Sequence, residues 1–242
     1  MKKLILAIIL LAAVPGFVLA AGGAIAIDKA PIDTGDRESQ ARGAQTYVAY
    51  CLGCHSLKFM RYNRLAADLG LDDAQLQALM VTTDKPGETI QNAMPAKQAQ
   101  QWFGTKIPDL SLVSRSRGSD WLYTYLRSFY ADPSRPLGVN NLLFKDVAMP
   151  HVLWEQQGLK QPVYTTNDHG QKVIETLEPG LPGRLSEAEY DQQVADLVNF
   201  LDYVGEPMKQ QRQRLGFWVL AFLVIFFGLS YALKKEYWRD IH

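Results

Sequence analysis

The hydrophobic and polar positions of this 242-residue chain divide it into three regions. An apolar stretch at 4–14 follows two lysines, and 215–233 is a run of 19 residues without a charge. Between them, apolar residues recur at helical spacing over 37–50 and again over 186–204. The pattern predicts a mainly helical domain between a short N-terminal and a long C-terminal apolar segment.

The N-terminal apolar stretch has the organisation of a secretory signal peptide. Lys2 and Lys3 form the charged start, Pro15-Gly16 ends the apolar part, and Val18-Leu19-Ala20 supplies small residues for cleavage. The stretch is too short, and wrongly flanked, for a spanning helix. We therefore expect residues 1–20 to be a signal peptide that is removed on export.

The C-terminal apolar segment has the length of a membrane span. As a helix, its 19 residues extend about 28 Å, close to the ~30 Å hydrocarbon core of a bilayer. Trp218 near one end and Tyr231 near the other suit the membrane interfaces. A buried core helix is the alternative, but it would not need so long a run without charge. We expect one transmembrane helix over 209–236, in contact with membrane lipid.

The charges beside this span do not set its orientation. Three basic residues precede it and three follow it: Lys209, Arg212 and Arg214, then Lys234, Lys235 and Arg239. This balance gives no positive-inside preference. The signal peptide decides instead. We expect residues 21–208 in the periplasm and 237–242 in the cytoplasm, with the span in a bacterial inner membrane.

The formal net charge is zero, but the predicted periplasmic domain is acidic. Residues 21–208 contain 17 Lys and Arg against 23 Asp and Glu, and 175–206 contains eight acids against one base, Arg184. Such a surface is either simply solvated or attracts a basic soluble partner. The sequence shows no basic patch of the kind that binds nucleic acid, so we expect no nucleic-acid partner.

The chain's two cysteines lie in the pentapeptide Cys51-Leu52-Gly53-Cys54-His55. This spacing is that of c-type haem attachment, in which both thiols bond one porphyrin and the histidine ligates the iron. A disulfide, a zinc half-site or a thioredoxin-like redox pair are alternatives. A zinc site needs two further ligands, and a redox pair does not require the histidine. The motif predicts one covalently bound haem c, with Cys51 and Cys54 as attachment points and His55 as an axial ligand.

The second axial position distinguishes an electron carrier from an open site. A methionine there raises the reduction potential and closes the iron to other ligands. Met-Pro dipeptides occur at Met94 and Met149. Met94 has few apolar neighbours in sequence, whereas Met149 follows an apolar-edged run that could form a wall of a haem crevice. We predict Met149 as the ligand over Met94, His151 and His169, although any one methionine could simply fill the core.

The remaining pattern predicts short helices, loops and one hairpin. These are a helix at 72–81, two helical pieces within 110–130 that meet at 117–119, a long loop at 132–150, and a hairpin at 163–177. Residues 82–108 are mixed, with two breakers, and Ser186 with Glu189 forms a capping box that opens the last helix of the domain. The predicted fold class is mainly α. It is a cytochrome c-like haem domain with long loop insertions and a small β-hairpin, plus one C-terminal transmembrane helix.

Four segments resemble the cytochrome c1 family, the haem subunit of ubiquinol–cytochrome c reductase. They are 51–65, 107–118, 138–158 and the run from 185 to the C-terminus, in the order of the family. The resemblance implies that Cys51 and Cys54 hold the haem and that His55 and Met149 are its axial ligands.

The same resemblance implies two further roles. Pro108 would pack against the haem, and Arg117 would pair with a propionate; from the residues alone, Arg117 is equally a surface arginine. The chain departs from the family twice. Ile107 stands where a proline is frequent, and fewer residues separate Arg117 from Trp121 than in many members.

The function that the resemblance implies is a one-electron relay. The haem would accept an electron from the Rieske iron–sulfur subunit and pass it to a soluble or tethered cytochrome c, beside a cytochrome b subunit. The chain would then not be an enzyme on its own. Two alternatives stay open: a haem enzyme or gas sensor with an open iron site, and a free-standing membrane cytochrome that feeds an oxidase.

Overall fold

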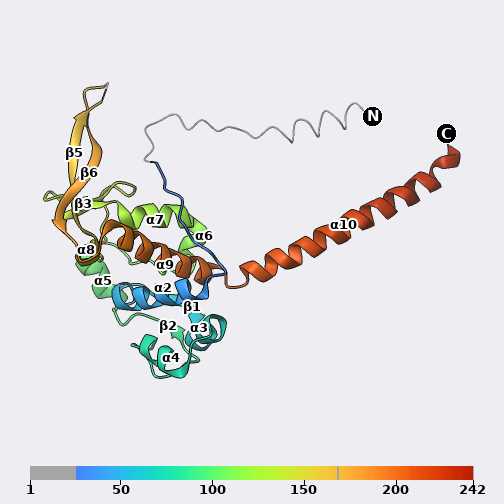
Figure 1. Cartoon of the computed structure of the whole chain (residues 1–242), viewed down its shortest axis with the longest axis horizontal. Helices are drawn as coiled ribbons and strands as arrows, with labels where there is room; N and C mark the ends of the chain where they lie inside the picture. Colours follow the sequence, from blue (N-terminus) through green and yellow to red (C-terminus); the bar gives the residue numbers. More distant parts are fainter. Residues whose placement is uncertain (1–25, 168, 242) are drawn as a thin grey trace.

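The structure is a computed structural model that describes residues 26–167 and 169–241 (Figure 1). The predicted signal peptide, 1–20, lies outside the described residues, as does Asp168 in the expected hairpin turn. The described part consists of a helical body, a projecting hairpin and one long helix that leaves the body.

Two helices far apart in sequence form the centre of the body. Helix α2 (Arg37–Tyr50) packs along α9 (Glu187–Gly205) (Figure 1), and the sequence patterns predicted both helices but not their contact. Their backbones meet at Gly43, where a Cβ would lie 2.1 Å from the carbonyl oxygen of Asp196. Both helices are capped at the N-terminus, and the capping box of Ser186 and Glu189 is confirmed. Because the two backbones are so close at residue 43, only glycine fits there.

A second group of short elements follows α2 in the chain. It comprises β1 (Leu57–Arg61), α3 (Tyr62–Leu69), α4 (Asp73–Leu79), β2 (Thr89–Ile90) and α5 (Ala96–Phe103). Two of them, α3 and α4, contact α2. The predicted helix at 72–81 is confirmed as α4. The mixed segment 82–108 contains β2 and α5, which we did not predict from the sequence. Helix α5 does carry apolar residues at helical spacing, Ala96, Ala99, Trp102 and Phe103, so a local signal was present and was overlooked.

The region after the second group differs in part from the expected pair of helices. Helices α6 (Val113–Arg117) and α7 (Ser119–Arg127) meet at Gly118, whose φ of 91° breaks the helix. The prediction of helix to residue 130 was wrong, since β3 (Phe129–Ala131) follows and pairs with β4 (Val139–Asn141). Strand β4 lies within the expected loop 132–150, and its pairing with β3 is a contact that local sequence does not encode.

The predicted hairpin is confirmed and is longer than expected. Strands β5 (Gly158–Thr166) and β6 (Lys172–Pro182) follow the short helix α8 (Trp154–Gln157) and extend away from the body (Figure 1). Together with β3 and β4 they form a four-stranded sheet in the order β4-β3-β5-β6. The described part of the chain thus has the expected mainly α class with one hairpin.

The C-terminal helix α10 (Lys209–Tyr237) runs away from the body (Figure 1) and is followed by a 3₁₀ turn, η1 (Arg239–Ile241). An 18-residue window of α10 has a mean hydropathy of 2.2, and none of that window is buried against the rest of the protein. Its length and composition are those of a membrane span. This apolar surface has no partner among the described residues, which is consistent with a membrane anchor.

Candidate functional site

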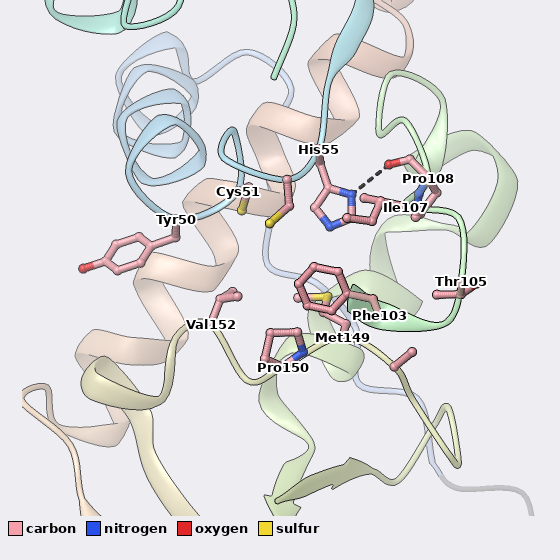
Figure 2. Close-up of a pocket in the computed structure, with 12 residues that line it drawn as sticks. Tyr50, Cys51, His55, Phe103, Thr105, Ile107, Pro108, Met149, Pro150 and Val152 are labelled. Atoms are coloured by element: carbon pink, nitrogen blue, oxygen red, sulfur yellow. Dashed lines mark hydrogen bonds between the residues drawn. The ribbon is translucent and has the colours of Figure 1, made fainter. Parts of the chain in front are cut away.

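The end of helix α2 places the two cysteines at one cavity. The helix stops at Tyr50, and the backbone turns so that the N–H groups of Cys54 and His55 both donate to the carbonyl of Cys51, over 3.0 and 2.8 Å. Tyr47 holds the end of this turn by donating from its hydroxyl to the carbonyl of His55. Both thiols are free and face the cavity (Figure 2).

The cavity contains about 520 Å³ of space that no atom fills, part of it open to solvent. Its walls come from the end of α2, the cysteine turn, the end of α5 and two loops. The lining residues are Tyr50, Cys51, Cys54, His55, Phe103, Thr105, Ile107, Pro108, Ala148, Met149, Pro150 and Val152. The lining is mainly apolar and therefore suits a flat hydrophobic ligand.

One ring nitrogen of His55 is already engaged. Its Nδ1 donates to the carbonyl oxygen of Pro108 over 2.8 Å (Figure 2). Burial lowers the pKa of His55, while the bond to Pro108 acts in the opposite direction. The neutral imidazole therefore keeps a lone pair on Nε2, which is the form that ligates a metal.

Met149 faces the same cavity from the other side (Figure 2). Its sulfur accepts a hydrogen bond from the hydroxyl of Tyr125 at 3.4 Å. Burial raises the pKa of Tyr125, so the hydroxyl keeps its proton. The rival Met94 is not among the residues that line the cavity, and His151 is buried outside it, stacked on Phe129 with ring centroids 4.8 Å apart.

The structure brings five of the six predicted site residues to the cavity: Cys51, Cys54, His55, Pro108 and Met149. Arg117 is the exception. Its side chain is exposed and its guanidinium lies 5.2 Å from the ring centroid of Trp121 and 5.9 Å from that of Phe144. Its pairing with a propionate stays a prediction.

Several functional residues were missed from the sequence. Phe103 ends the unpredicted helix α5 and lines the cavity. Asn92 fastens the cysteine turn, because its amide donates to the carbonyl of Cys54 and its oxygen accepts from the hydroxyl of Ser56. Asn92 had no local signal, whereas the apolar spacing of α5 was a signal for Phe103. Tyr125 also had one, since it lies four residues after Trp121 and shares one face of α7 with it.

The residues at the cavity fit a haem. Burial raises the pKa of Cys51 to about 12 and raises that of Cys54, so both thiols are protonated and uncharged against apolar walls. A free imidazole nitrogen and a thioether face each other across the space. By contrast, no cluster of three His, Cys, Asp or Glu residues that could hold a bare metal ion occurs in residues 26–167 and 169–241.

A helical domain with this turn, this cavity and these facing side chains belongs to the class of cytochromes. The model of the Cytochrome C1 family matches residues 28–161 and 185–241. The chain belongs to this family, whose members carry haem and transfer electrons in the cytochrome bc1 complex. The gap in the match, 162–184, contains most of the β5–β6 hairpin.

Individual relatives agree with the family match. Cytochrome c1 of Allochromatium vinosum is 50% identical over the full length of both chains. A protein of Nitrosomonas europaea named ammonia monooxygenase gamma subunit is 47% identical over 100% of this chain and 99% of its own length. Cytochrome c1 of Rhodospirillum rubrum is 25% identical over 85% of this chain and 83% of its own.

Proposed function

We propose that this chain takes single electrons from a Rieske iron–sulfur subunit and passes them to a soluble or tethered cytochrome c. One haem is bound covalently through Cys51 and Cys54, with His55 and Met149 as axial ligands. The observation that carries this proposal is the apolar cavity closed by an imidazole nitrogen on one side and a thioether on the other.

The bound haem supplies reversible one-electron chemistry. The chain's own residues fix and tune it. The Pro108 carbonyl holds the His55 ring in the tautomer that presents Nε2, and Met149 occupies the position that an exogenous ligand would need. Phe103 and Val152 line the cavity with apolar side chains and would limit the access of water to the bound group.

The long helix supports a membrane location. We propose that α10 anchors the chain within 209–236, that residues 21–208 lie in the periplasm after removal of 1–20, and that 237–242 is cytoplasmic. The ion pairs Lys209–Asp202, at 2.7 Å, and Arg212–Glu206 fasten the start of the anchor to the end of α9. A chain ending at Met208 should be released to the soluble fraction with its haem. Retention in membranes would contradict the anchor.

The acidic stretch 175–206 gives limited support for attracting a basic acceptor. Four of its eight acids form ion pairs within the body: Asp191 with Arg127, Asp196 with Arg42, Asp202 with Lys209, and Glu206 with Arg212. The other four are exposed, Glu175 and Glu178 on the hairpin and Glu187 and Glu189 at the start of α9. Attraction of a basic cytochrome c would depend on these four, not on the whole stretch.

Purification in mild detergent tests the function. We expect the chain to co-migrate with a cytochrome b and an iron–sulfur protein, and its haem to be reduced by quinol and reoxidised by added cytochrome c. A Cys51→Ser, Cys54→Ser variant is the control and should lack covalent haem. A chain that migrates alone and is not reduced by quinol would contradict the proposal.

A haem enzyme with an open iron site is the second candidate, and the Nitrosomonas relative carries the name of an enzyme subunit. This candidate requires that Met149 is not a ligand, although its side chain faces the cavity. The spectrum of the purified protein separates the two. A far-red charge-transfer band from a bond between the haem iron and the methionine sulfur, together with no CO binding, supports the electron carrier. Ready CO binding without that band supports the enzyme.

A further inference from the structure

Four side chains at four-residue intervals form a continuous stack beside the cavity. The guanidinium of Arg117 lies 5.2 Å from the Trp121 ring, Trp121 stacks on Tyr125 with centroids 4.9 Å apart, and Tyr125 meets Phe129 edge-on at 5.2 Å. Trp121 and Tyr125 share one face of α7, and Arg117, the last residue of α6, meets Trp121 across the break at Gly118. The ring of Tyr125 is thus held on two sides.

The far end of the stack returns to the segment that carries Met149. Phe129 packs face to face on His151, with centroids 4.8 Å apart and planes 2° from parallel. His151 is two residues after Met149 and is buried. The same stack that holds Tyr125 therefore also holds the loop on which Met149 lies, so the separation of these two side chains is fixed from both sides.

The hydroxyl of Tyr125 has a single hydrogen-bond partner among the described residues, the sulfur of Met149 at 3.4 Å. The O–H donates and the thioether accepts, since methionine sulfur has lone pairs and no proton. A sulfur that accepts a hydrogen bond through one lone pair donates less electron density to a metal through the other. Hydrogen bonds just outside the ligand shell are an established way of tuning a bound metal.

We propose that Tyr125 acts on the site through Met149: its hydrogen bond to the Met149 sulfur raises the reduction potential of the haem. The bond draws electron density from the sulfur and so weakens its interaction with ferric iron more than with ferrous iron. This inference rests on the proposed function, in which Met149 is an axial ligand. It concerns the hydroxyl and not the packing of the ring.

Tyr125→Phe in the full chain with its haem tests this, because it removes the hydroxyl and keeps the stack. At a fixed ambient potential, the ratio of reduced to oxidised haem should fall, by at most about fivefold, because the difference between the two redox states is limited by the energy of one ordinary hydrogen bond. The far-red band of the bond between haem iron and Met149 sulfur should keep its intensity. Cyanide should bind the oxidised protein less tightly, because the sulfur that it displaces is then held more strongly by ferric iron. Tyr123→Phe is the matched control on the same helix; the Tyr123 ring lies beside Arg127, and its loss of a hydroxyl should change none of the three.

Each result decides the question. A potential equal to that of the Tyr123→Phe control overturns the proposal. Loss of the band in Tyr125→Phe also overturns it, because the hydroxyl would then serve to hold Met149 in place and not to tune it. Absence of the band in the unmodified protein has a different meaning: it overturns the assignment of Met149 itself, and this inference with it.

Discussion

The imidazole of His55 donates to the carbonyl oxygen of Pro108 over 2.8 Å, although 53 residues separate them in sequence. The bond fixes which ring nitrogen carries the proton and turns Nε2 to the cavity. Since the acceptor is a backbone carbonyl, it is always available to His55, whatever the pH. The site therefore presents its nitrogen ligand already oriented.

Met149→Leu should lower the midpoint potential by on the order of 0.1–0.2 V, a fraction of the ~0.8 V over which axial ligands set haem potentials. The physical reason is that a thioether favours ferrous iron and leucine offers no donor. Met94→Leu is the control, because Met94 does not line the cavity. Redox titration measures both, and a fall confined to Met94→Leu would assign the ligand to Met94.

Asn92→Ala should loosen the cysteine turn. It removes both the amide bond to the Cys54 carbonyl and the acceptor of the Ser56 hydroxyl. Leaving partly buried partners unpaired costs about 1–3 kcal/mol of unfolding free energy. Thermal unfolding of the haem-loaded protein measures the loss. Gln91→Ala is the control, since the Gln91 side chain is exposed and bonds Thr89 at the surface; equal effects would refute a special role for Asn92.

Gly43→Ala should separate α2 from α9. The added Cβ would lie 2.1 Å from the Asp196 carbonyl oxygen and 2.7 Å from the Cβ of Phe200, and neither is a flexible group. We expect a loss of about 3 kcal/mol in stability, the upper part of the usual cost of overpacking. Gly87→Ala has open space around it and should be nearly neutral. Denaturant unfolding compares the two, and similar midpoints would show that the helices can move apart without cost.

His151 should make the protein less stable in acid. Burial lowers its pKa to about 4, below the ~6.5 expected in the unfolded chain. Above pH 6.5 both states are neutral and the stability is complete; as pH falls below that value the unfolded state takes up the proton first, and stability is lost down to about pH 4.

His151→Phe keeps a ring against Phe129 and removes this titration. It should abolish a pH-dependent loss on the order of 3 kcal/mol at pH 4. Unfolding free energies measured between pH 4 and 7 test this, with His169→Phe at an exposed position as control. An unchanged slope in His151→Phe would assign the acid sensitivity to other groups.

Local sequence determined the elements that carry their own signals. The helices α2 and α9 follow from apolar periodicity and from capping residues such as Ser186, and α10 follows from a run without charge. The cysteine motif is local too, because five consecutive residues carry both thiols and the imidazole, whereas the bonds from Asn92 and to Pro108 that hold them are tertiary contacts. Resemblance to the cytochrome c1 family added the expected roles of Pro108 and Arg117, and the family match shows that the resemblance itself is correct.

Tertiary structure decided everything that depends on partners distant in the chain. Strand β3 gains its stability from pairing with strands elsewhere in the chain, so the local pattern misread it as helix. The positions of Met149 at the cavity and Met94 outside it, and the bond from Tyr125 to the Met149 sulfur, likewise exist only once separate segments pack together. Periodicity shows which face of a helix or strand is buried, whereas tertiary packing determines which residues that face contacts.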